Sequence, residues 1–106
     1  MKLYILQVFD IEYKDDILLA LTTAEITRAT VVEGLNMEGL LDQDFPLFSG
    51  LFRSQADRAR YSQIIFGTVD DDEAIDAFLT VLKQAGIDNS DERVFRLVTM
   101  PVEHRQ

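Results

Sequence analysis

The chain has 106 residues, 47% of them hydrophobic, and its ten basic and nineteen acidic residues give a formal charge of −9. This length suits one hydrophobic core, so we expect residues 1–106 to form a single domain. The negative charge disfavours binding to nucleic acid or to anionic lipid, because both rely on a basic protein surface. The absence of cysteine excludes disulfides and thiolate metal sites.

The first apolar run of the chain ends at Asp10. It is too short for a transmembrane span and lacks the three-part pattern of a signal peptide. We therefore expect a cytoplasmic protein with no membrane insertion.

The first half of the chain predicts a strand, a helix and a second strand. The segment 2–9 is apolar on both alternating faces, as in a central strand. Asp15 or Asp16 is expected to cap a helix, whose core-facing stripe is Ile17, Leu18, Leu21 and Ala24. The β-branched residues from Thr30 onward begin the next strand.

The second half predicts a strand, a helix and a final strand. The segment 62–69 alternates as a strand, and Asp70 with Glu73 forms a capping-box pattern at the start of a helix. That helix has an apolar stripe and is expected to end at Gly86, and segment 94–102 gives the last strand. The stripe consists of Ile75, Phe78, Leu79 and Leu82.

This order predicts an α+β fold of the ferredoxin-like βαββαβ type. Two right-handed strand–helix–strand units interleave into a four-stranded antiparallel sheet with both helices on one face. Strands one and three are apolar on both faces, so the uncovered face needs another partner, and we expect self-association.

A long loop is predicted between strands two and three, from about residue 36 to residue 60. Connections of this length are usually functional. It carries an apolar run from Phe45 to Phe52, which either packs against the protein or docks a partner, and then Arg53, Arg58 and Arg60. The three arginines are expected to attract phosphate or carboxylate groups; the alternative is pairing with nearby carboxylates.

Four segments in order carry a resemblance to a known family: 2–5 (KLYI), 15–32 (DDILLAL running on to RATVV), 69–71 (VDD) and 98–103 (VTMPVE). Together they resemble the PII superfamily of signalling proteins, which includes nitrogen-regulation proteins, over essentially the whole chain. The resemblance implies a ferredoxin-like homotrimer with a long loop between strands two and three. It also implies binding of a small molecule between subunits and action on a protein partner through that loop.

The chain departs from the family pattern at the nucleotide site. The family's Gly-x-Gly-Arg element corresponds to Asn36-Met37-Glu38-Gly39, and its glycine-rich phosphate loop corresponds to the acidic segment 86–93. Acidic side chains there would repel a triphosphate by roughly 1 kcal/mol or more apiece. Tyr61 lies too late to match the family's modified tyrosine. The sequence thus resembles a divergent PII-like protein, and it does not decide whether the chain binds a nucleotide.

From these patterns we expect a non-enzymatic, PII-like regulator. It would bind a small anionic metabolite, with an adenine nucleotide as one candidate, and act on a partner through residues 38–60. The resemblance places the ligand at Thr30, Glu33, Asn36 and Met37, and charge adds Arg53, Arg58 and Arg60. No catalytic or metal-binding residue and no cofactor is predicted.

Two alternatives remain open. One is a metal-responsive trimer of the divalent-cation tolerance type, which the absence of cysteine and of an internal histidine disfavours. The other is a ferredoxin-like enzyme, such as a cofactor-free dimeric monooxygenase. Fold alone does not separate these functions. The only histidine, His104, lies in the C-terminal tail, and the acidic run 70–73 is better explained as a helix cap than as a cation site.

Overall fold

The protein is described by a computed structural model, which places residues 1–37, 61–104 and 106. The elements are, in chain order, β1 (Lys2–Val8), the short 3-10 helix η1 (Ile11–Tyr13), α1 (Lys14–Thr23), β2 (Ala29–Leu35), β3 (Tyr61–Val69), α4 (Asp72–Gln84) and β4 (Phe95–Pro101). No helix within these ranges is long and apolar enough to cross a membrane.

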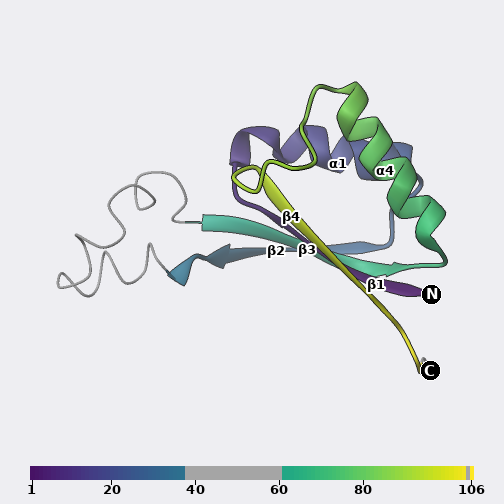
Figure 1. The fold of residues 1–106 in the computed structure, drawn as a ribbon. Coiled ribbons are helices and arrows are strands. Elements are labelled where there is room, and N and C mark those ends of the chain that lie inside the picture. The colour runs from purple at the N-terminus through teal and green to yellow at the C-terminus, as the bar shows by residue number, and fades with distance from the viewer. Residues whose placement is uncertain (38–60, 105) are drawn as a thin grey trace.

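The four strands form one antiparallel sheet in the order β2-β3-β1-β4, and α1 and α4 pack together over one of its faces (Figure 1). This is the ferredoxin-like βαββαβ arrangement, and it confirms the predicted fold class. The long connection between β2 and β3 is confirmed as residues 36–60. The apolar run 45–52 lies outside the described residues.

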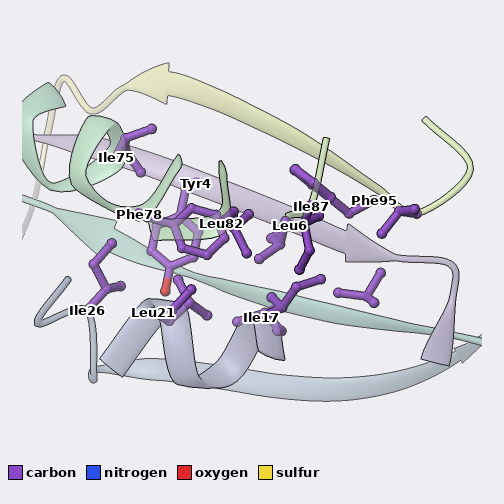
Figure 2. Close-up of a cluster of buried hydrophobic side chains, with 14 of the residues drawn as sticks. Tyr4, Leu6, Ile17, Leu21, Ile26, Ile75, Phe78, Leu82, Ile87 and Phe95 are labelled. Atoms are coloured by element: carbon purple, nitrogen blue, oxygen red, sulfur yellow. The ribbon is translucent and has the colours of Figure 1, made fainter. Parts of the chain in front are cut away.

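The core lies between the two helices and the sheet face beneath them. β1 is the centre of this core, because its alternate residues Tyr4, Leu6 and Val8 are almost completely buried. They contact apolar side chains from both helices and from β3, as Figure 2 shows for Ile17, Leu21, Phe78 and Leu82. Each such side chain contributes about 1.5–3 kcal/mol when it is fully buried. Core packing therefore fixes which face of the sheet the helices cover.

Both helices end in the same hydrogen-bonded motif. At the end of α1, the Ile26 N–H donates to the Leu21 carbonyl at 2.8 Å and the Glu25 N–H donates to the Thr22 carbonyl at 3.0 Å. At the end of α4, Ile87 and Gly86 donate to Leu82 and Lys83 at 2.9 and 3.0 Å. This double pattern is the Schellman motif. Ile26 and Ile87 follow the two turns and are both buried, so each turn brings an apolar side chain back into the core.

The two turns share a left-handed backbone conformation, but one has glutamate and the other glycine at that position. Gly86 has a φ of 84°, as predicted from its position after the helix, and Glu25 has a φ of 63°. Glycine adopts this left-handed conformation freely, whereas a residue with a side chain does so at a cost of roughly 1–2 kcal/mol. The first turn is thus strained and the second is not.

The helix starts differ from the sequence prediction. Asp71, not Asp70, caps α4: its carboxylate accepts from the N–H groups of Glu73 at 3.1 Å and Ala74 at 3.4 Å. Its backbone is extended, as a cap requires, so the helix begins one residue later than the capping-box pattern indicates. Neither Asp15 nor Asp16 caps α1, because Asp10 caps η1 and the chain continues from η1 into α1.

Replacing Glu25 with glycine should stabilise the protein. Glycine removes the left-handed strain of about 1–2 kcal/mol, and the greater freedom of glycine in the unfolded chain offsets part of that gain. Gly86→Ala should have the opposite effect, and it tests the backbone alone because no heavy atom lies within 4 Å of the added Cβ. Urea denaturation of both variants would measure the two changes. A loss of stability in Glu25→Gly would contradict this account.

Candidate functional site

β2 and β3 form a two-stranded ribbon that runs past the helix layer toward residues 38–60 (Figure 1). The last pair in its register is Leu35 with Tyr61. The ligand residues predicted in this part of the chain gather along the same strand: Thr30 and Glu33 lie in β2, and Asn36 and Met37 follow its end. These four predicted ligand residues therefore lie in β2 or directly after it, where the connection to β3 begins.

The structure places Thr30 and Glu33 on opposite faces of the sheet. Glu33 pairs with Gln63, next to Val8 in β1, which faces the helices. Thr30 pairs with Phe66, which lies on the uncovered face. Residues an odd number of positions apart in a strand point to opposite sides. One small ligand on one face would therefore contact only one of these two side chains. Asn36 is half-buried, and Met37 is 71% exposed.

The three arginines of the predicted anion patch, Arg53, Arg58 and Arg60, lie outside the described residues, as does the rest of segment 38–60. The anion patch stays a prediction from charge.

The helix-side face of the ribbon carries an exposed strip that the sequence reasoning missed. We define the ribbon strip as Val31, Glu33 and Leu35 of β2 with Tyr61 and Gln63 of β3. Its apolar members are 46–57% exposed, although they point to the same side of the sheet as the core. The two-residue alternation of β2 in the sequence already places Val31, Glu33 and Leu35 on one face of the strand. Sequence alone did not show that the helices stop short of them.

The ribbon strip contains two hydrogen-bond acceptors that have no donor among the described residues, the Glu33 carboxylate and the Gln63 side-chain oxygen. The Gln63 side-chain oxygen is buried and has no hydrogen-bond partner. Within the described ranges, the Glu33 carboxylate makes no ion pair or side-chain hydrogen bond. Directly opposed residues in antiparallel strands have Cβ atoms about 4.5–5.5 Å apart, so the two acceptors are neighbours. This pair would repel an anion and attract an N–H donor.

The other face of the sheet is mostly apolar, and no helix or strand in the ranges 1–37 and 61–104 covers it. In register, Ile5 of β1 lies between Phe66 of β3 and Val98 of β4. These three side chains are 37–45% exposed. None of the strand residues that point to this face is acidic, which is unusual in a chain of net charge −9. We call this surface the open face; its apolar members are Leu3, Ile5, Val32, Ile64, Phe66, Val98 and Met100.

Polar groups lie at one end of the open face. The Gln7 amide donates to the hydroxyl of Ser62 at 3.3 Å, and Ser62 is 1% exposed. Arg96, beside Gln7 in the register, places its guanidinium carbon 5.9 Å from the centre of the Phe9 ring. That distance suits a cation–π contact. Arg96 is the only charged strand residue on this face.

The connection from α4 to β4 is held by hydrogen bonds to two of its own carboxylates. Asp88 accepts from the Ser90 N–H at 2.9 Å and from the Ser90 hydroxyl at 2.7 Å. Asp91 accepts from the Arg93 guanidinium at 3.1 Å and from the Arg93 N–H at 3.0 Å. The bonds from Ser90 lower the pKa of Asp88, and those from Arg93 lower the pKa of Asp91. The chain's own donors thus occupy both carboxylates, which remain charged at neutral pH.

These two turns should weaken in acid. Because the carboxylate pKa values are lowered in the folded protein, their stabilising contribution is present above the ordinary value of 3.8 and is lost as the pH falls through the folded values. An NMR titration that follows the side-chain carboxyl carbons and the Ser90 and Arg93 amides would measure this. Midpoints at or above 3.8 for Asp88 and Asp91 would show that the hydrogen bonds do not persist in solution.

The structure also shows where the histidine and the acidic run of the sequence lie. His104 follows β4 and is exposed. In the described part of the chain, no group of three or more histidine, aspartate or glutamate side chains could hold a metal ion. The acidic run at residues 70–73 contains the cap of α4, which agrees with the helix-cap interpretation.

A scan against protein-family models finds no match for this chain, and a search among curated proteins finds none either. The ferredoxin-like fold is therefore the level at which the structure classifies the protein. The finer resemblance to the PII superfamily is carried forward as a proposal.

Proposed function

We propose that this chain is a PII-like regulatory protein without catalytic activity. It forms a homotrimer through the open face and binds a small anionic metabolite, with an adenine nucleotide as a candidate, between its subunits. It acts on a protein partner through the connection at residues 38–60. The observation that carries the proposal is the open face itself, a mostly apolar surface whose described strand residues include no acidic group, on a strongly acidic chain.

Self-association follows from the chemistry of this surface. Burying apolar surface contributes about 25 cal/mol per Å². Copies that each carry a charge of −9 repel one another, so a shared interface is favourable only where acidic groups are absent. The open face meets both conditions, and the helix-covered side of the sheet does not offer such a surface.

A regulator also accounts for the position of the long connection. Functional residues are disproportionately found in loops held by a rigid scaffold, and here 25 residues, 36–60, join two adjacent strands. A metabolite regulates a partner only if it binds one state of the protein more tightly than another. A metabolite bound between subunits and beside this connection could favour one state of the connection, and that state would bind the protein partner.

The assembly can be tested with two adjacent positions in β4. Val98→Glu places a carboxylate in the open face, whereas Thr99→Glu places the same group on the other side of the same strand. We expect the native protein and Thr99→Glu to have the mass of three 12.1-kDa chains, and Val98→Glu to dissociate. Light scattering at micromolar concentration measures all three. Equal behaviour of the two variants would exclude the open face as the interface, and a native dimer would favour the enzyme alternative.

The ligand can be tested with the arginines that the sequence singles out. A thermal-shift screen of ATP, ADP, AMP and dicarboxylates should reveal a ligand that raises the melting temperature, because it binds only the folded state. Arg58→Ala and Arg60→Ala should each weaken that ligand about ten- to a hundredfold, the loss of a charge-assisted contact of about 1.5–3 kcal/mol. Lys83→Ala, on α4, is the matched control. Unchanged affinity in both arginine variants would overturn the anion patch.

A further inference from the structure

The two edges of the sheet are protected to different degrees. In the order β2-β3-β1-β4, the edge strands are β2 and β4. Edge strands that avoid pairing with other chains usually carry lysine, proline or other charges, or are very short. β4 has Arg96 near its start and Pro101 at its end, whereas β2 reads ATVVEGL, with the charge of Glu33 but no lysine or proline. Five of the seven β2 residues are exposed. β2 is therefore the edge that is open to an added strand.

The ribbon strip shows what such a strand would need to present. Along the helix-side face of β2, exposed Val31 and Leu35 flank the Glu33 carboxylate. Beside it, the buried Gln63 oxygen has no donor. A buried acceptor without a partner costs about 1–3 kcal/mol. The strip thus offers two apolar contacts with an unsatisfied, negatively charged position between them.

We propose that the free edge of β2 binds an extended segment of a protein partner with the pattern apolar–x–Arg/Lys–x–apolar. Alternate residues of an added strand point to the same face, so one basic side chain lies opposite Glu33 and the two apolar ones lie opposite Val31 and Leu35. Cross-strand pairs of opposite charge and of apolar side chains stabilise a sheet. The partner's backbone pairs with β2, and its basic group pairs with the exposed Glu33 carboxylate.

The charge of the chain agrees with a basic partner. A protein of net charge −9 attracts cationic segments from a distance and repels acidic ones. The open face has no acidic strand residue and lies on the opposite side of the sheet, so the two surfaces bind different groups. This inference deepens the proposed function, because it gives the chemistry of the protein partner of the proposed regulator. It rests on the described strand alone.

A designed peptide tests the pattern on the full-length protein. The probe is the capped peptide Thr-Val-Thr-Arg-Thr-Val-Thr, with a second peptide in which glutamate replaces the arginine. We expect the first peptide to shift the NMR signals of residues 29–35 and the second to have no effect. Shifts centred on the open face, at Ile5, Phe66 and Val98, would overturn the proposal.

Two pairs of variants separate specific binding from general attraction to an acidic protein. Glu33→Gln should weaken the arginine peptide about tenfold, while Asp76→Asn, which removes the same charge from an exposed position of α4, should change it less than about twofold. Leu35→Ser should also weaken binding, and Leu19→Ser, at a comparably exposed position of α1 (65% against 57%), should not. Equal effects within either pair would overturn the proposal.

The same variants distinguish this inference from the proposed function. If Glu33→Gln or Leu35→Ser lowers the mass of the assembly, the β2 edge is an interface between copies and the inference fails, whereas the trimer stands. If the peptide binds as expected but no metabolite raises the melting temperature, the inference stands and the metabolite-binding function fails.

Discussion

The structure depends on one constraint: a single layer of two helices can cover only one face of a four-stranded sheet. β1 and β3 are apolar on both faces, so covering one face leaves the other as an apolar surface. Helix packing over Tyr4, Leu6 and Val8 decides which face becomes the core. Because side chains alternate along a strand, the residues between the core residues point to the other face and are exposed there. The open face is thus a consequence of how the core forms, and its lack of acidic residues is a separate property of the sequence.

The same constraint has a second consequence along the length of the sheet. The ribbon of β2 and β3 runs past the helices (Figure 1), so strand residues on the same face as the core are exposed to solvent there. Ile65 and Val31 are register neighbours on that side, yet Ile65 is fully buried and Val31 is 46% exposed. Because the two residues stand at the same level, this difference comes from the position of β2 at the edge of the sheet. The ribbon strip thus lies beyond the helix layer on its β2 side.

Much of the fold could be predicted because its signals are local. The apolar stripes of α1 and α4 and the glycine after α4 have direct structural equivalents. The cap positions were missed because adjacent aspartates fit the same pattern, and only backbone geometry selects Asp71 over Asp70. The left-handed turn at Glu25 carries no sequence signal, since the residue normally found there is glycine.

The candidate site was harder to predict, because it depends on which residues share a face. The family resemblance grouped Thr30 with Glu33, and the alternation of β2 separates them. Gln63 and the unpaired hydroxyl of Tyr4 could not be recognised from sequence, because an unsatisfied polar atom is a property of the packed structure. The arginines of segment 38–60 were singled out by charge alone.

The separation of Thr30 from Glu33 limits where an anion can bind. Two like charges about 4 Å apart repel by roughly 1 kcal/mol in water and by about 4 kcal/mol near a protein surface. An anionic metabolite therefore avoids the helix-side face at Glu33, where the neighbouring Gln63 oxygen adds a second acceptor. Thr30 lies across the sheet, on the face where none of the described strand residues is acidic, and no strand carboxylate there opposes an anion. If one strand serves both a metabolite and a protein partner, the chemistry of its two faces assigns the anion to the side of Thr30 and the basic partner to the side of Glu33.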